Sequence, residues 1–436
     1  MPQTATTDIP ESDAHTPHPP LAILVRRWWF LWPLALRLLT WLFLAQAYEA
    51  SVFQDASRQM VAGQGVYARF AGWVTATGDG YFAAPPTYAY MLWVSGRLAA
   101  VFGDHWWLHQ LLIKTWLLAA DLAVMAYLLY RHPRAARSYW TLWFVPIVAI
   151  GQLQPDLWVG LLVLAALALA RQGRWMWTGA LLGVGASLKP VPLIIVPFLI
   201  IFLFRAGNRR AGAPLSIGLL AALAAGWLPY VLLFPDAREF IEVIRFHAAR
   251  PVAGLTIPSG ILLIVNAALT LTELHGIRAL SVSGAYEAVV RAGAAYPVVT
   301  AGVFGALLAG AAAGRRWSLP QTFAFPLLAF LAANKVVHEH YILQVLPLLL
   351  VRGQDLRGLV TAFSVYLLAA GSPLRFFPAE LGLPSTIDVV LPPPAGLIVS
   401  LTLAVVTGIA AVAFGMQVLS LMASFSWRAP PRSGSD

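Results

Sequence analysis

Two residues of opposite charge flank a hairpin of apolar segments in the middle of the chain. Asp156 follows the segment GQLQP, and Lys189 precedes Pro190 at the end of WMWTGALLGVGASL. A basic turn, RQGR at residues 171–174, joins the two segments. A carboxylate and an ammonium at one end of such a hairpin suit general base catalysis and the binding of a phosphate oxygen. Helix-terminus electrostatics for Asp156 and snorkelling of Lys189 to a membrane surface are the structural alternatives.

Other polar residues suggest parts of the same chemistry. Gln152 and Gln154 stand beside Asp156 and would offer polar contacts to a substrate at membrane depth. In the first polar loop, Asp55 lies in YEASVFQDASRQM, whose spacing predicts an amphipathic helix with Phe53 and Met60 on the apolar side. A carboxylate near a desolvated cavity suits a general base that takes a proton from an acceptor hydroxyl. A solvated surface acid is the alternative.

The densest polar cluster on an apolar run is NKVVHEHY at residues 334–341. If this segment is helical, Asn334, His338 and Tyr341 share one face by the three-to-four spacing, and Lys335 pairs with Glu339. No metal site is predicted, because His338 and a histidine two residues later diverge on a helix. Ionisable side chains at the end of an apolar helix favour a substrate site. The candidates are Lys335 and His338 for a donor phosphate, and Asn334, Glu339, His340 and Tyr341 for the substrate.

A further amphipathic segment, PDAREFIEVIRFHAARP, spans residues 235–251. It predicts a helix that lies on the outer membrane surface, where Arg245 or Arg250 could clamp a lipid phosphate. The alternative is a solvated helix in which Glu242 pairs with Arg238 and Arg245.

The composition indicates the environment of these residues. A chain of 436 residues with 59% hydrophobic and 11% charged side chains has too much apolar surface for a soluble globule. No cysteine is present, so no disulfide or thiolate metal site can form. The net charge of +10 does not indicate nucleic acid, because the basic residues fall in short turns between apolar runs. We therefore expect an all-α, multi-pass protein of the cell membrane, with no nucleic-acid partner, no metal and no other cofactor.

The arginine turns set the expected topology. We expect a disordered cytoplasmic tail at 1–25, a transmembrane domain at 26–424 and a second cytoplasmic tail at 425–436, with about twelve spans. The first span, from Trp29 to about Ala47, is too long and starts too late for a signal peptide. The arginines that the positive-inside rule assigns to the cytoplasm are Arg26, Arg27, Arg131, Arg134, Arg137, Arg171, Arg174, Arg205, Arg209, Arg210, Arg315, Arg316, Arg352, Arg357, Arg428 and Arg432.

This topology makes three further predictions. If residues 87–102 crossed the membrane, the next arginine turn, at residues 131–137, would lie outside the cell. We therefore interpret 87–102 as a juxtamembrane or half-inserted helix of the first external loop. The spans at 139–152 and 157–170 have only about 14 residues where a bilayer needs ~20, so we expect a wet cavity at their outer ends. Arg37 and Asp121 lie at similar depth in their spans, which predicts a buried structural ion pair.

The order of these motifs resembles the GT-C superfamily of polyprenyl-phosphate-sugar-dependent glycosyltransferases. The resemblance covers most of the membrane region. It rests on YFAAPPTYAYML at 81–92, GQLQPD at 151–156 and GALLGVGASLKPVP at 179–192. Within the superfamily the chain looks like the bacterial mannosyltransferases that use polyprenyl-phosphate mannose. NKVVHEHYIL at 334–343 is also similar to a segment of the first mannosyltransferase of glycolipid-anchor assembly.

The resemblance implies roles for particular residues. Asp55 is the expected catalytic base with Asp156 assisting, and the regions of Lys189 and His338 hold the donor phosphate. One departure from the family pattern concerns the first loop, where the anchor enzymes carry two acids one residue apart. Here Gln54-Asp55-Ala56-Ser57 offers one acid, which leaves Glu49 as the second carboxylate nearby.

The expected function is therefore transfer of a hexose, with mannose favoured, from a polyprenyl-phosphate carrier to an acceptor hydroxyl on the extracytoplasmic face. The partners implied are the lipid-phosphate sugar donor, a glycolipid or glycan acceptor, and membrane lipid. A phosphate leaving group needs a cation, for which Lys189, Arg245 and Lys335 are candidates. A secondary transporter and a non-catalytic lipid-binding assembly subunit are the alternatives.

The sidedness can be tested directly, because the chain has no cysteine of its own. In separate Asp55→Cys and Asp156→Cys variants, reaction with a membrane-impermeant thiol reagent should occur from outside the cell and not from the cytosol. The arginine turns should stay in the cytoplasm under the positive-inside rule. Labelling of position 156 from the cytosol and of position 55 from outside would mean that no shared pocket exists.

Overall fold

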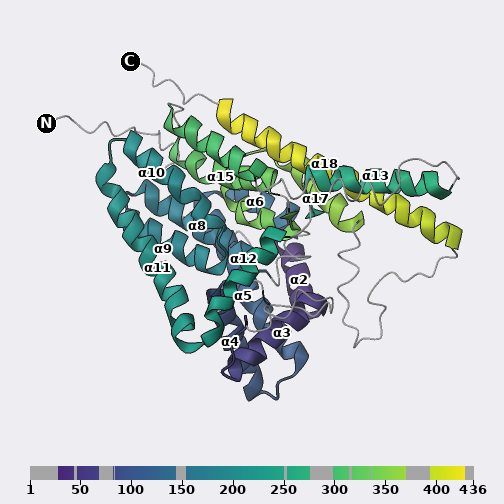
Figure 1. Cartoon of the computed structure of the whole chain (residues 1–436), viewed down its shortest axis with the longest axis horizontal. Helices are drawn as coiled ribbons and strands as arrows, with labels where there is room; N and C mark the ends of the chain where they lie inside the picture. The colour runs from purple at the N-terminus through teal and green to yellow at the C-terminus, as the bar shows by residue number, and fades with distance from the viewer. Residues whose placement is uncertain are drawn as a thin grey trace.

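The computed structural model describes residues 28–43, 47–67, 82, 84–143, 154–249, 253–274, 298–313, 317–334, 336–369 and 393–427. These residues are helical almost throughout (Figure 1), which confirms the predicted all-α class. The exception in this part of the chain is a pair of two-residue strands. Residues 1–27 and 428–436 lie outside the description, and with them most of both predicted tails.

The first half of the chain forms helices that were largely expected. α2 and α5 match the first predicted spans, α3 lies in the first loop, and α4 matches the helix predicted at 87–102. The elements are α2 (Trp28–Phe43), α3 (Ala47–Val61), α4 (Pro86–Val101), α5 (Trp106–Arg131), α6 (Pro133–Leu142), α8 (Asp156–Arg171), α9 (Trp175–Leu188), η2 (Val191–Ile194), α10 (Ile195–Arg205), η3 (Arg209–Ala211) and α11 (Gly212–Leu233).

The second half contains the short strands and the longest helix. In Figure 1, α18 runs along the upper edge beside α13, and α12 crosses the centre. The elements are η4 (Pro235–Glu239), α12 (Phe240–Ala249), β1 (Ala253–Gly254), α13 (Ile257–Leu274), α15 (Leu319–Ala333), β2 (Val336–Val337), η5 (Glu339–Gln344), α16 (Leu346–Val351), α17 (Arg357–Ala369) and α18 (Pro393–Trp427), together with a helix at Val298–Ala312.

Two helices extend beyond the bounds expected from the sequence. α6 starts at Pro133 and includes Arg134 and Arg137 of the predicted turn, and residues 144–152 of the expected span lie outside the described residues. Proline favours the first position of a helix, where its missing N–H costs no hydrogen bond. α18 continues to Trp427, so the first residues of the expected C-terminal tail are helical.

Small residues let α9 and α11 pack closely along the left side of Figure 1. A Cβ atom at Gly179 would lie 1.9 Å from the carbonyl oxygen of Leu215, and one at Gly218 would lie 1.9 Å from that of Met176. Such residues allow helix backbones to approach where lipid offers no hydrophobic driving force. The two helices run parallel, so their arginine-flanked starts lie at the same end.

Three helices in the described part of the chain are long and apolar enough to cross a membrane, namely Trp107–Arg131, Arg209–Leu233 and Leu401–Ser424. Five shorter apolar helices accompany them: Trp29–Phe43, Val191–Arg205, Val298–Ala312, Leu319–Ala333 and Arg357–Ala369. A membrane association is therefore supported by length and composition. The count of twelve crossings stays a prediction.

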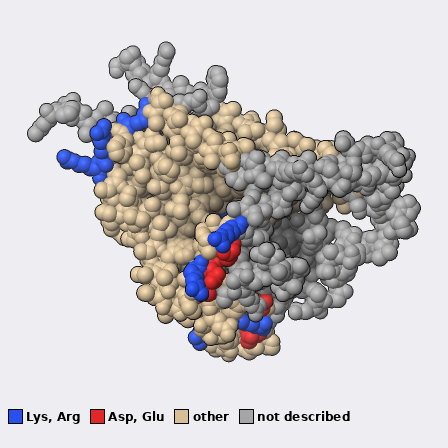
Figure 2. Space-filling view, viewed as in Figure 1, with Lys and Arg blue, Asp and Glu red and all other residues tan. Residues whose placement is uncertain are grey.

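Arginines from different turns gather at one end of the bundle. The pKa of His132 lies below its usual value, because the side chain is partly buried and the charges of Arg171 and Arg131 lie nearby. Figure 2 shows Lys and Arg without Asp or Glu at the upper left, where Figure 1 has the ends of α10 and α11. Near the centre and the lower edge the two signs lie side by side. The charges are thus separated along the described part of the molecule, and the sidedness of the arginine turns stays a prediction.

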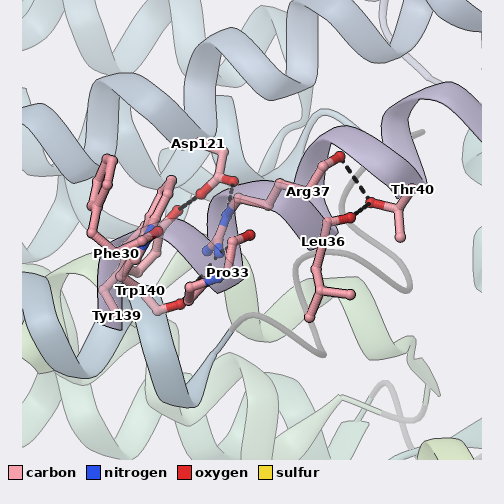
Figure 3. Close-up of polar contacts among 8 residues, drawn as sticks. All are labelled: Phe30, Pro33, Leu36, Arg37, Thr40, Asp121, Tyr139 and Trp140. Atoms are coloured by element: carbon pink, nitrogen blue, oxygen red, sulfur yellow. Dashed lines mark hydrogen bonds and ion pairs between the residues drawn. The ribbon is translucent and has the colours of Figure 1, made fainter. Parts of the chain in front are cut away.

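A buried ion pair joins α2 to α5, as predicted (Figure 3). The Arg37 Nε atom donates to Asp121 Oδ2 at 2.5 Å, and the hydroxyl of Tyr139 donates to Asp121 Oδ1 at 2.6 Å. The guanidinium also lies 3.8 Å from the ring centroid of Trp140, whose indole N–H donates to the Phe30 carbonyl at 2.9 Å. The pair therefore ties α6 to α2 and α5 as well.

Removal of one partner of the Arg37–Asp121 pair should lower the stability of the fold more than removal of both. Arg37→Met leaves the Asp121 carboxylate buried without its cation, and we expect a loss of about 3–5 kcal/mol in stability. The double variant Arg37→Met, Asp121→Leu should recover most of this loss, because no buried charge remains. Thermal unfolding of the purified protein in detergent measures both. Equal losses in the single and double variants would contradict the structural role of the pair.

Candidate functional site

Asp156 and Lys189 meet at one end of the α8–α9 hairpin. α8 begins at Asp156 after Pro155, and α9 ends at Leu188, since the proline that follows Lys189 disfavours a helical conformation there. The Lys189 ammonium donates to both carboxylate oxygens of Asp156, at 2.8 and 3.0 Å. The expectation that the hairpin brings the two residues to the same end is therefore confirmed.

The Asp156 carboxylate is completely buried, whereas the Lys189 side chain is 17% exposed. Two further groups approach the carboxylate from η5. The side-chain amide of Gln344 donates to Oδ1, and the imidazole Nε2 of His340 lies 3.8 Å from Oδ2. A buried carboxylate is tolerated where donors and a counter-ion surround it. The exposed part of the pair is thus the cation.

Gly160 explains how η5 comes so close to α8. It lies one helical turn after Asp156, and a Cβ atom there would be 2.4 Å from the carbonyl oxygen of Leu343. Any larger side chain would push η5 away. The glycine therefore permits Gln344 to reach Asp156.

Aromatic rings form a wall beside the ion pair. The Lys189 ammonium lies 4.0 Å from the ring centroid of Tyr341, within the range of a cation–π interaction. The rings of His338 and His340 stack, with centroids 5.3 Å apart and an interplanar angle of 9°. Tyr341 meets these two rings nearly edge-on, at 5.5 and 5.0 Å. Within this wall His340 and Tyr341 are buried, and His338 is partly exposed.

The helix expected through residues 334–341 is absent, and this part of the prediction was wrong. α15 ends at Ala333, Asn334 is extended, and Val336–Val337 pairs in parallel with Ala253–Gly254. Gly254 has a φ of 76°, and a Cβ atom there would lie 2.1 Å from the Val337 carbonyl oxygen. Asn334, His338 and Tyr341 therefore share no helix face. The extended backbone and the 3₁₀ turn bring His338, His340 and Tyr341 together instead.

The remaining predicted site residues lie apart from this cluster or outside the described residues. Asp55 is exposed on α3, whose amphipathic character is confirmed because Phe53 and Met60 are buried. Gln154 is half-buried just before α8. Arg245 is exposed on α12 and pairs with Glu242, as in the solvated alternative. The structure does not describe Gln152, Lys335, Arg250 and the side chain of Glu339.

Sequence reasoning missed Gln344. It is the one polar side chain in the run ILQVLPLLLV at residues 342–351, and this isolation in an apolar run was the signal that could have found it. Its contact with Asp156 makes it part of the site.

Sequence reasoning also placed Asp236 on an external surface, whereas its carboxylate is buried. The backbone N–H of Tyr67 donates to Asp236 at 2.7 Å, and the hydroxyl of Tyr230 donates at 3.1 Å. Burial raises the pKa of Tyr67, and the charges of Tyr230 and Asp236 raise it further. Gly65 is required here, because a Cβ atom would lie 1.9 Å from the Asp236 carboxylate. The Tyr67 hydroxyl in turn donates to the Ala84 carbonyl at 2.7 Å.

Among the described residues, no three His, Asp or Glu side chains are grouped so that they could hold a metal ion. No protein-family model matches the chain, and a comparison with curated proteins finds no significant match. The site is therefore defined by its own geometry: a buried carboxylate, a partly exposed ammonium and an aromatic wall.

The contribution of the Gln344 hydrogen bond to stability can be measured by comparison with another buried glutamine, Gln110. Gln344→Leu removes a donor from the buried Asp156 carboxylate, and we expect a loss of about 1–3 kcal/mol in stability. Gln110 is also buried, but its amide has no hydrogen-bond partner. Gln110→Leu should therefore leave stability unchanged or raise it. Thermal unfolding in detergent compares the two variants, and equal losses would remove Gln344 from the site.

Proposed function

We propose that this protein is an integral-membrane glycosyltransferase. It moves a hexose, with mannose favoured by the family resemblance, from a polyprenyl-phosphate carrier to a hydroxyl group of a glycolipid or glycan acceptor on the extracytoplasmic side. The observation that carries the proposal is the partly exposed Lys189 ammonium, which a buried carboxylate holds at the end of the hairpin opposite the arginine turn. A lipid-phosphate leaving group needs a cation at such a position.

In the proposed reaction, the acceptor hydroxyl oxygen forms a bond to the anomeric carbon of the sugar. The bond from that carbon to the phosphate oxygen breaks, and its electron pair leaves with the polyprenyl phosphate. The hydroxyl proton passes to the Asp55 carboxylate. Negative charge grows on the departing phosphate, and Lys189 stabilises it. Attack from the face opposite the phosphate inverts the configuration at the anomeric carbon.

Asp156 acts in this scheme as a positioning residue. Lys189 and Gln344 already donate to its oxygens, so the carboxylate is suited to hold the ammonium and not to take a proton from the acceptor. Asp55 is the better base, because its side chain is exposed on the first-loop helix α3. The acceptor and the donor must then bridge α3 and the hairpin. A substrate bound at both groups would bring the two reacting parts together.

The other candidate site residues would contact the donor or the acceptor. The ring of His338 is partly exposed and stacks on the buried ring of His340, so it is the candidate contact for the sugar, with Tyr341 packed edge-on behind it. Exposed Arg245 on α12 and Lys335 are secondary contacts for the carrier phosphate. The remaining polar candidates for the substrate are Gln152, Gln154, Asn334 and Glu339.

The proposal predicts a large loss of transfer in Lys189→Gln. Removal of one group that stabilises the developing charge typically lowers kcat by about 10²–10³. The assay uses membranes that contain the protein and polyprenyl-phosphate mannose labelled in the sugar, and it follows the appearance of label in acceptor products. Asp55→Asn should lose transfer to a similar extent, because no general base remains.

Asp355→Asn is the matched control for Asp55→Asn. Asp355 is also an exposed acid, and it lies between α16 and α17, within the expected cytoplasmic turn that contains Arg352 and Arg357. Its variant should retain full transfer. Wild-type rates in Lys189→Gln would contradict the role of the ammonium. Movement of label across the membrane by the parent protein without sugar transfer would instead identify a transporter.

A further inference from the structure

A cavity of about 440 Å³ lies between α10, α15 and the end of the helix Val298–Ala312. It is remote from the Asp156–Lys189 pair, because α10 begins shortly after Lys189 and the cavity surrounds its far half. The volume is within the range of small-molecule and lipid sites in proteins, about 300–1,000 Å³. The proposed sugar transfer does not use it.

The walls of the cavity are mainly apolar and aromatic. Phe198 and Phe202 of α10 face it, together with Trp317 before α15. The rings of Phe198 and Trp317 stack with centroids 5.6 Å apart, and Trp317 also packs on Phe325 at 5.0 Å. An apolar chain would fill such a space, whereas an inorganic ion would leave these walls without contacts.

Arg205 supplies the charged group of the cavity. It is the last residue of α10, is exposed, and lines the cavity. One of its Nη atoms donates to the Ala311 carbonyl at 2.7 Å, which fixes the guanidinium against the neighbouring helix. A guanidinium carries five N–H donors in a planar arrangement that matches the oxygens of a phosphate.

Arg205 stands in a basic stretch of the chain. Arg209 and Arg210 follow in η3, and both are exposed. Neither α10 nor η3 nor α15 nor the helix Val298–Ala312 contains an aspartate or a glutamate. In Figure 2 the same end of the molecule shows Lys and Arg alone. The charge therefore selects an anionic ligand.

We propose that this cavity binds an anionic phospholipid from the cytoplasmic leaflet, with its phosphate on Arg205 and part of its acyl chain between Phe198, Phe202 and Trp317. The arginine turns place this end of α10 at the cytoplasmic membrane surface, where a lipid supplies a phosphate and an apolar chain together. Basic pockets between membrane helices on that side take anionic headgroups.

The test measures lipid binding to the purified full-length protein in detergent by native mass spectrometry. Phosphatidylglycerol should bind at least about fivefold more tightly than phosphatidylcholine, since one arginine near a headgroup contributes about that factor. Arg205→Gln should lose this preference, and Arg205→Lys should keep most of it. Arg209→Gln is the matched control, because Arg209 is a neighbouring exposed arginine that does not line the cavity. If Arg205→Gln and Arg209→Gln lost the preference for phosphatidylglycerol to the same extent, the proposal would be overturned.

A second measurement separates a lipid from a free phosphate and remains valid if Arg205→Gln is less stable. The thermal unfolding temperature of each variant is compared with and without phosphatidylglycerol or inorganic phosphate. The lipid should raise this temperature for the parent protein but not for Arg205→Gln, and inorganic phosphate should raise neither. An equal, Arg205-dependent rise with inorganic phosphate would show a simple anion site and would overturn the lipid proposal. Sugar transfer should stay unchanged in Arg205→Gln, so failure of either proposal is seen separately.

Discussion

The buried carboxylate of Asp156 is the constraint on which this end of the molecule depends. A carboxylate with no exposed surface must be surrounded by donors, and Lys189 after α9 and Gln344 of η5 donate to it, while the imidazole of His340 lies 3.8 Å away. The need to satisfy one charge therefore decides where the hairpin and the segment after α15 lie relative to each other. Because the charge belongs to a side chain at a helix start, it fixes the position of Lys189 without the need for a rigid loop.

The same need explains why small residues recur near the site. Gly160 and Gly254 allow backbone contacts of η5 and β2 that a Cβ atom would prevent. The short strand pair follows the end of α15 and redirects the chain so that the rings of His338, His340 and Tyr341 pack together, with Tyr341 against Lys189. The strand pair and the 3₁₀ turn η5 are too short to be stable alone. The need to surround the buried Asp156 carboxylate with donors and a cation stabilises them.

Sequence reasoning found the features that depend on residue type and helical spacing. The Arg37–Asp121 pair followed from equal depth in two spans, and the placement of Asp156 and Lys189 at one end followed from the hairpin, although their direct contact was not predicted. It missed the strand pair, because two residues carry no periodic pattern. It also missed the burial of Asp236, whose partner Tyr67 is 169 residues away in the sequence. Such contacts depend on tertiary packing, which the local pattern does not contain.

The hydroxyl of Tyr67 has a consequence for the evolution of the first loop. The backbone N–H of Tyr67 donates to Asp236, and its hydroxyl donates to the Ala84 carbonyl. These two hydrogen bonds hold both ends of the loop between positions 67 and 84. The entropic cost of closing a loop grows only slowly with its length. Insertions or exchanges between the two ends should therefore leave α3 and α4 in the same relative position.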